Sequence, residues 1–254
     1  MALRKENGLV LYSKILNDAD AMITVLGDRS PKLKFIVKGI KKSKKRPIAS
    51  CEIGSLISLD YYFHGERDFY NVKEINLIER FDYAKSSYLE YLLINYFCEL
   101  LNIFLTEGEI HERGFKIAYA CFNILNRKEY HPILLPYFKV KLLMELGLIS
   151  YELVCHECGR EYRETSGVHL NPYTLEIICR SCNNYIQENT QVVNFIDLAI
   201  HGKYAILKDM NIHSSLLIEA DHLLNLYIRA YIHRDIKSEQ VLYTHLRGKD
   251  EFRS

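Results

Sequence analysis

Two cysteine pairs place the tightest limit on how this chain can fold. Cys155 and Cys158 are separated by two residues, Cys179 and Cys182 have the same spacing, and 20 residues lie between the pairs. Two such pairs can bring four thiolates around one ion in a tetrahedron, the usual geometry of structural zinc. The alternative is four unrelated buried cysteines. Because the protein would supply all four ligands, the spacing predicts a structural four-cysteine zinc finger over residues 151–189, with one Zn²⁺ per chain.

The remaining cysteines and the apolar stretches bear on the compartment. Cys51, Cys98 and Cys121 are expected to be small buried residues. Seven cysteines without a secretion signal favour a reducing compartment, so we expect a cytoplasmic protein. The most apolar long stretch, residues 88–105, includes two glutamates, which argues against a membrane span.

The first third of the chain has the pattern of short β-strands. Runs rich in Val, Ile, Leu and aromatic residues alternate with turn residues, and no helical pattern interrupts them. Five short strands in about 75 residues fit a small antiparallel barrel, and the expected form is an OB-fold over residues 1–81 that binds single-stranded nucleic acid. Other small barrels have the same number of strands. The five predicted strands are residues 8–15, 21–26, 33–40, 51–63 and 69–80.

A strongly basic segment, KGIKKSKKR, occupies residues 38–46 between the third and fourth predicted strands. Residues 1–50 carry 12 Lys and Arg against 4 Asp and Glu, whereas the rest of the chain has a net charge of −7. Gly39 and Pro47 indicate a loop. The segment is either a solvated charged hairpin or a loop that binds phosphates, and a basic N-terminal part favours a polyanionic partner. The predicted phosphate-binding residues are Lys38, Lys41, Lys42, Lys44, Lys45 and Arg46.

Several neighbouring residues are second choices for the same surface. Lys32 and Lys34 lie on the adjacent predicted strand, and the basic residues at positions 4 and 5 could form an arm. Bases stack on exposed aromatic rings in single-strand binders, which makes Tyr62 and Tyr70 candidates for stacking. Alternation along a strand buries about half of such side chains, so burial is the competing explanation.

Beyond residue 81 the apolar spacing becomes helical. Helices are predicted over residues 83–105, 109–127 and 132–146, with a short one at 194–199 and a long amphipathic one at 214–231. Ser86 or Ser87 could cap the first helix, with Glu90 in the capping-box position for Ser87. The prediction is therefore an α+β chain, in which a helical domain of residues 82–150 and 190–254 carries the zinc finger as an insertion.

The chain has no recognisable catalytic set. His233-Arg234-Asp235-Ile236-Lys237 looks like the catalytic loop of a protein kinase, but Gln240 stands where that loop has asparagine. No glycine-rich GxGxxG loop precedes it, and the Walker A, GxSxG and HExxH motifs are also missing. We therefore expect a protein that is not an enzyme.

Taken together, these segments resemble the family of the bacterial recombination mediator RecO. The opening GLVLYSKILNDADAMITVL is similar to that family's first hairpin, and KGIKKSKKR to its basic loop. LPYFKVKLLMELGLI followed by CHEC resembles its passage from a helix through glycine into the zinc finger. The stretch Asp235 to Ser238 occupies the place of a lysine-serine stretch near the family's end. The chain departs from many members at Ile177 and Ile178, where they have glycines.

The resemblance implies an OB-fold, a helical domain and a zinc finger. It also implies binding of single- and double-stranded DNA, annealing of complementary strands and joint action with RecR to load RecA onto strands coated by single-strand binding protein. Binding the acidic tail of that protein would need a basic rim on the helices, with Arg113, Lys116 and Arg127 as candidates. The implied location is cytoplasmic and nucleoid-associated. A different possibility is a zinc-ribbon assembly protein whose barrel binds structured RNA or a protein partner.

Overall fold

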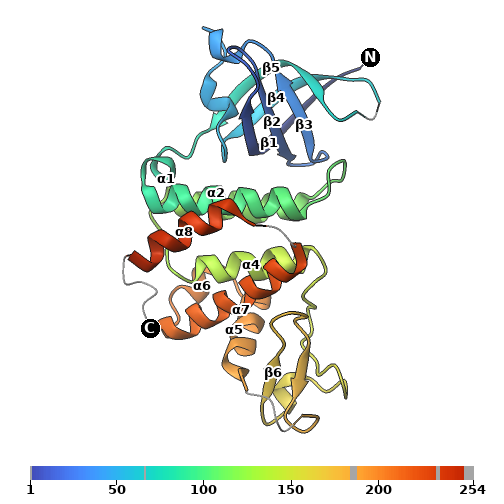
Figure 1. The fold of residues 1–254 in the computed structure, drawn as a ribbon, viewed down its shortest axis with the longest axis vertical. Helices are drawn as coiled ribbons and strands as arrows, with labels where there is room; N and C mark the ends of the chain where they lie inside the picture. The colour runs from blue at the N-terminus through green and yellow to red at the C-terminus, as the bar shows by residue number, and fades with distance from the viewer. Residues whose placement is uncertain (1, 66, 184–187, 233–234, 249–254) are drawn as a thin grey trace. The chain divides into compact units, whose positions relative to one another are not determined.

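The computed structural model describes residues 2–65, 67–183, 188–232 and 235–248. The chain forms two compact units (Figure 1). Unit 1 comprises Met1–Tyr130 with Ile236–His245, and unit 2 comprises His131–Asp235 with Leu246–Ser254. The helices that directly follow the barrel therefore belong to the same unit as the barrel. The finer division of the chain into domains of residues 1–81, residues 82–150 with 190–254, and residues 151–189 stays a prediction.

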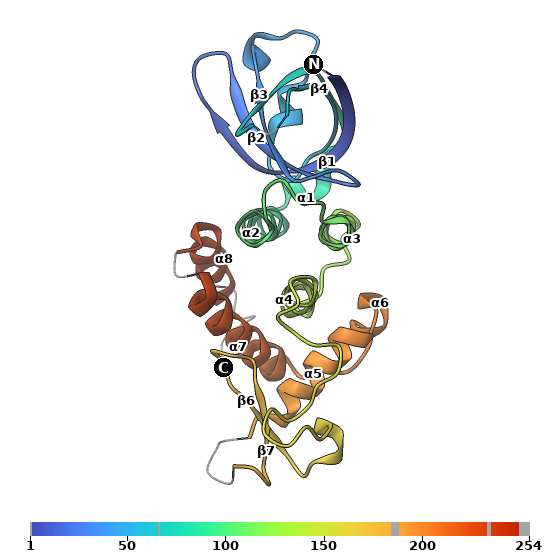
Figure 2. The ribbon, with the colours of Figure 1, turned by 90° about the vertical axis from the view of Figure 1, so that its right-hand side faces the viewer.

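Unit 1 contains a closed five-stranded barrel, seen nearly end-on in Figure 2. The strands pair in the order β1-β2-β3-β5-β4, and β4 pairs with β1 to close the ring. β3 and β5 pair in parallel, and the other neighbours are antiparallel. This arrangement confirms the predicted OB-like barrel. The strands are β1 (Ala2–Ile15), β2 (Ala21–Gly27), β3 (Leu33–Val37), β4 (Leu56–Phe63) and β5 (Tyr70–Glu79).

The first strand is longer than predicted, and one glycine explains how it closes the barrel. Gly8 pairs with Gly27 on β2 and also with Ile57 on β4. A Cβ atom at Gly8 would lie 2.5 Å from the Val25 side chain, so a larger residue would force the strands apart. β1 begins at Ala2, so Arg4 and Lys5 lie within a paired strand and not in a separate arm. Arg4 pairs with β4, and its guanidinium carbon lies 3.5 Å from the ring centroid of Phe63.

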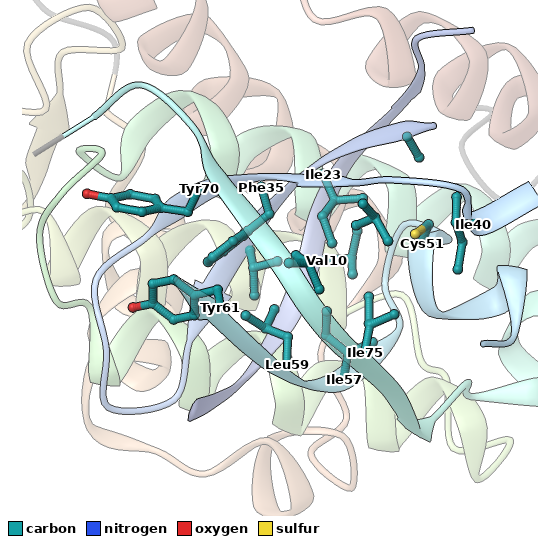
Figure 3. Close-up of a cluster of buried hydrophobic side chains, with 14 of the residues drawn as sticks. Val10, Ile23, Phe35, Ile40, Cys51, Ile57, Leu59, Tyr61, Tyr70 and Ile75 are labelled. Carbon is teal, nitrogen blue, oxygen red and sulfur yellow. The ribbon is translucent and has the colours of Figure 1, made fainter. Parts of the chain in front are cut away.

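Aromatic rings fill one end of the barrel core (Figure 3). The rings of Phe35 and Tyr61 meet edge-on with centroids 5.0 Å apart, and Tyr61 meets Tyr70 at 5.6 Å. Tyr70 is only 4 % exposed, and its hydroxyl donates to the carbonyl of Gly65 at 2.9 Å. The predicted base-stacking role of Tyr70 is therefore wrong, because its ring belongs to the core. Tyr62, one residue after a buried ring, is half-buried.

The helices described in unit 1 are α1 (Asp82–Ser86), α2 (Tyr88–Phe104), α3 (Glu112–Asn126) and, as far as His245, α8 (Lys237–Gly248). The helix predicted over 83–105 is broken at Ser87, whose backbone is extended with φ −95° and ψ 127°. Ser87 caps α2 by position, but its hydroxyl donates to the carboxylate of Glu90 and the predicted capping box is not formed.

The last helix, α8, was not predicted from the sequence. Glu99 on α2 accepts hydrogen bonds from the backbone amides of Lys237, at 3.2 Å, and Ser238, at 2.8 Å. A carboxylate at a helix N-terminus satisfies free amides and complements the helix dipole. The segment that resembles a kinase loop thus begins a helix of unit 1 from Lys237 onward, and its His233 and Arg234 lie outside the described residues.

The described residues of unit 2 form four helices and a two-stranded sheet. The elements are α4 (Leu134–Glu145), β6 (Val168–Leu170), β7 (Ile177–Cys179), α5 (Thr190–His201), α6 (Tyr204–Leu207) and α7 (Ser214–Ile232). α5 extends beyond both ends of the short helix predicted at residues 194–199.

Fully buried Lys139 on α4 reaches Asp221 on α7 at 2.5 Å and Asn225 at 2.6 Å. A buried charge needs such partners, so this contact fixes the pairing of α4 with α7.

Within the described parts of the chain, every helix is too short or too polar to cross a bilayer.

We predict that Glu6 makes the barrel less stable as the pH rises. Burial raises the pKa of this carboxyl to about 7 from an ordinary value of 4.5, although the hydrogen bond from Tyr61 acts in the opposite direction. The folded state therefore keeps a proton that the unfolded state has lost between these pH values. The free energy of unfolding should fall as the pH rises through that window, by on the order of 3 kcal/mol at pH 8.

Replacement Glu6→Gln removes the titration while keeping an acceptor for the Tyr61 hydroxyl, which donates to Glu6 at 3.1 Å. Urea unfolding at pH 5 and pH 8 should show a smaller loss of stability in this variant than in the wild type. Glu74→Gln, at an exposed position of β5, is the control and should follow the wild type. Equal pH dependence of the wild type and Glu6→Gln would contradict the prediction.

Candidate nucleic-acid interface and metal centre

The basic segment forms a loop that is fixed at both ends in the barrel core. It joins β3 to β4 through two short 3-10 turns, Ile40–Lys42 and Ile48–Cys51. Ile40 is 1 % exposed and Cys51 is 3 % exposed, and both belong to the cluster in Figure 3. Gly39 begins the first turn with φ +66°, a conformation that glycine adopts without strain. The lysines between these two anchors therefore project from a loop of defined shape.

Backbone hydrogen bonds hold the loop against the neighbouring β1–β2 turn. The carboxylate of Asp20 accepts the Gly39 amide at 2.7 Å, and the carbonyl of Ala19 accepts the Lys41 amide at 3.1 Å. Arg46 connects the two ends of the loop, because its guanidinium donates to the carbonyl of Lys38 at 2.6 Å. These contacts order the loop without using any of its lysine ammonium groups.

The lysine side chains of the loop are exposed to solvent. None of their ammonium groups lies within 4 Å of a carboxylate in the described part of the chain. Arg46 is half-buried and braces the backbone. The loop thus presents closely spaced positive charges to the solvent, as a phosphate-binding surface requires. The five exposed residues are Lys38, Lys41, Lys42, Lys44 and Lys45.

Asp20 is the acidic residue at the base of this surface. Hydrogen bonds from Asn17 and from the Gly39 amide lower the pKa of Asp20, and the charges of Lys38 and Lys42 lower it further. Its carboxylate therefore stays ionised and serves the loop as a hydrogen-bond acceptor.

The two second-choice lysines lie elsewhere. Lys32 is 4 % exposed, and its ammonium group donates to the carbonyls of Asn102 at 2.7 Å and Leu105 at 2.6 Å. It neutralises the C-terminal end of α2 and cannot reach a phosphate, so it leaves the predicted DNA-binding set. Lys34 is half-buried and forms an ion pair with Glu107 at 2.5 Å, so a phosphate would have to compete with that carboxylate.

The four predicted ligand cysteines come together in unit 2. The sulfur atoms of Cys155, Cys158, Cys179 and Cys182 all lie within 4.8 Å of one another, and those of Cys158 and Cys179 are 3.8 Å apart. Zinc–sulfur bonds of about 2.3 Å would put the sulfurs of a tetrahedral site about 3.8 Å apart. The cluster therefore has the donor set and the spacing to hold one metal ion.

The local backbone explains why these cysteines meet. Gly159, with φ +73°, turns the first knuckle and donates its amide to the carbonyl of Cys155 at 2.8 Å. β6 and β7 form a hairpin that brings Cys179 beside Cys155. Burial opposes ionisation of the Cys155 thiol, but amide donors led by that of Cys179 outweigh it and lower the pKa of Cys155 to about 6. His156 stays outside the cluster, is exposed and faces Glu176 at 3.4 Å.

Comparison with known proteins decides the family. The family profile described as "Recombination protein O N terminal" matches residues 1–81, and "Recombination protein O C terminal" matches residues 85–240. The chain belongs to the RecO family. A DNA repair protein RecO of Leptospira biflexa serovar Patoc is 30 % identical over 238 residues, covering 94 % of this chain and 96 % of the relative.

More distant RecO relatives match over similar or shorter lengths. The DNA repair protein RecO of Symbiobacterium thermophilum is 22 % identical, covering 96 % of this chain and 98 % of its own length. That of Clostridium acetobutylicum is 27 % identical over 186 residues, covering 72 % of this chain and 73 % of its own length. The resemblance seen in the sequence is thus confirmed at the level of the family.

The side chains that hold the basic loop in place, Asp20 and Arg46, were not predicted from the sequence to do so. Asp18 and Asp20 look alike in the sequence, as solvated turn acids, yet only Asp20 accepts the Gly39 amide among the contacts of the described residues. The Asn-x-x-Asp turn at residues 17–20 was the available signal, because Asn and Asp side chains often bind backbone amides.

We predict that Asp20→Ala loosens the basic loop. It removes the acceptor of the Gly39 amide, and one hydrogen bond contributes about 1 kcal/mol, so exchange of that amide should speed up by about fivefold. Asp18→Ala makes the same change of charge at an exposed position two residues away and is the matched control. Amide hydrogen exchange by NMR measures both. Unchanged exchange at Gly39 in Asp20→Ala would show that the loop is held by other contacts.

We also predict that the cysteine cluster retains a metal ion through purification. Elemental analysis should find about one equivalent per chain, and Cys179→Ser should lose it and melt at a lower temperature, because metal binding is coupled to folding. Cys121→Ala, a buried cysteine of unit 1, should keep the metal. A wild-type protein with far less than one equivalent, or a Cys179→Ser variant that keeps it, would refute the site.

Proposed function

We propose that the chain is a DNA-binding mediator of repair and homologous recombination that binds single- and double-stranded DNA and anneals complementary strands. The observation that carries this proposal is the set of exposed lysines on the loop anchored by Ile40 and Cys51. Membership of the RecO family supports it.

The mechanism is electrostatic and needs no covalent step. Lysines bound to phosphates release condensed counterions, which drives binding of any DNA sequence. Positive charge between two strands also reduces their mutual repulsion, so one loop can favour the pairing of two strands. The proposed phosphate-binding residues are Lys38, Lys41, Lys42, Lys44, Lys45 and Arg46, with Lys34 at the margin.

We propose that the metal is a structural Zn²⁺ held by the four cysteines. Four thiolates leave no position for water, so the ion would fold the segment around β6 and β7 and would not act as a Lewis acid. The metal would thus stabilise unit 2, which would bind protein partners, while unit 1 would bind DNA.

The proposed protein partners follow from the family. The chain would act with RecR to load RecA onto strands coated by single-strand binding protein, in the cytoplasm and at the nucleoid. Arg113 and Arg127 are exposed at the two ends of α3 and are candidates for the acidic tail of single-strand binding protein. Lys116 is a weaker candidate, because it pairs with Glu112 at 3.6 Å.

We predict that replacing Lys41, Lys42, Lys44 and Lys45 with alanine weakens DNA binding for every sequence. Each phosphate contact contributes about 0.7 to the slope of log affinity against log salt for single strands, so the slope should become shallower by up to about 3. Fluorescence anisotropy of labelled oligonucleotides in a salt series measures this change.

The control carries arginine at the same four positions, keeps the charge and should bind like the wild type. An alanine variant with wild-type affinity and slope would contradict the proposal. Tight binding of structured RNA, or of a protein partner, with little dependence on salt would favour the zinc-ribbon assembly alternative instead.

A further inference from the structure

A cavity of about 410 Å³ opens in unit 1 beside the basic loop. Its walls come from β1, the turn Ile48–Cys51 and helix α2, all of which lie within the same unit. Such a volume falls in the range of about 300–1,000 Å³ that is usual for small-ligand sites.

Three large apolar side chains at this cavity are unusually exposed. Ile15 is 47 % exposed, Ile48 is 48 % exposed and Tyr91 is 44 % exposed, although they come from three different elements. Exposed apolar groups that converge on one cavity indicate a surface that a ligand covers. The ring of Tyr91 offers a face against which a planar group can stack.

Polar groups lie in the same cavity. The carboxylate of Glu52 accepts hydrogen bonds from the Arg80 guanidinium at 2.9 and 3.3 Å, and buried Lys85 approaches the same carboxylate at 3.6 Å. Burial lowers the pKa of Lys85, while Glu52 opposes that shift. The wall therefore contains donors and an acceptor of the kind that the edge of a heterocyclic base requires, and a base would compete with their pairing to one another.

The cavity adjoins the cations. Ile48 follows Arg46 by two residues, and Ile48 and Cys51, from the turn that ends the basic loop, both line the cavity. A strand whose phosphates follow the loop would therefore carry its bases past the cavity mouth.

We propose that this cavity binds an unpaired nucleobase, stacked on Tyr91, of a strand whose phosphates lie on the basic loop. The inference rests on the proposed function, because it needs the loop to bind DNA. It adds a reason for the protein to distinguish single strands from duplexes, since a paired base cannot enter the cavity.

The test compares two probes with the same phosphates: a 15-nucleotide thymidine oligomer and a fully abasic oligomer of equal length. The wild type should bind the thymidine oligomer at least about fivefold more tightly at one salt concentration, because a stacked base contributes about 1 kcal/mol or more. Tyr91→Ala should bring the two affinities together without weakening the abasic probe. Tyr91→Phe should keep the preference, and Tyr173→Ala, an exposed tyrosine of unit 2, should behave as the wild type.

A second readout does not depend on affinity. The chain contains no tryptophan, so Tyr91→Trp introduces a single reporter. Its emission should be quenched by the thymidine oligomer and not by the abasic one.

Equal binding of both probes by the wild type, or a preference that survives Tyr91→Ala, would overturn the inference while leaving the proposed function intact. A change in the Tyr91→Trp emission on addition of an acidic apolar peptide, without quenching by the thymidine oligomer, would assign the cavity to a protein partner and would also overturn it. Failure of both probes to bind would remove the proposed function itself.

Discussion

The placement of the basic loop depends on its two apolar anchors in the barrel core. Ile40 and Cys51 belong to the same buried cluster as the strand residues of β2, β3 and β4, so the chain must leave and re-enter the core at fixed points. Lysines close together repel one another, and an unanchored loop would spread them apart. Apolar burial offsets that repulsion, since each fully buried aliphatic side chain contributes roughly 1.5–3 kcal/mol.

In the basic loop, the groups that maintain its shape differ from the groups that present its positive charge. Its shape is maintained by backbone amides bound to Asp20 and Ala19 and by Arg46 bound to Lys38, so the arginine acts partly as a brace. The lysine ammonium groups take no part in these contacts and keep their charge available. Elsewhere in the chain, positive charges such as Lys32 at the end of α2 and Lys139 against Asp221 have structural partners. The location of a lysine relative to the buried core therefore decides whether its charge has a structural partner or is available to a ligand.

The sequence predicted the barrel, the cysteine cluster and the basic loop because each has a local signal of spacing or charge. It failed where long-range contacts decide. Nothing local indicates that Gly8 lies where β1 pairs with two strands, so the start of β1 was placed too late. Tyr70 and Lys32 look exposed by type, and only the closed barrel and the end of α2 bury them. α8 begins where Glu99, more than 130 residues earlier in the chain, accepts its first amides.

The most direct measurement for the central claim is a lysine footprint, in which an amine-reactive reagent labels the protein with and without a single-stranded oligonucleotide and mass spectrometry reads each site. Exposed Lys203 in unit 2 and buried Lys32 provide the references. The account predicts that DNA protects Lys38, Lys41, Lys42, Lys44 and Lys45, that Lys203 reacts equally in both samples, and that Lys32 reacts in neither. Loop lysines that stay fully reactive when the DNA is bound would contradict it.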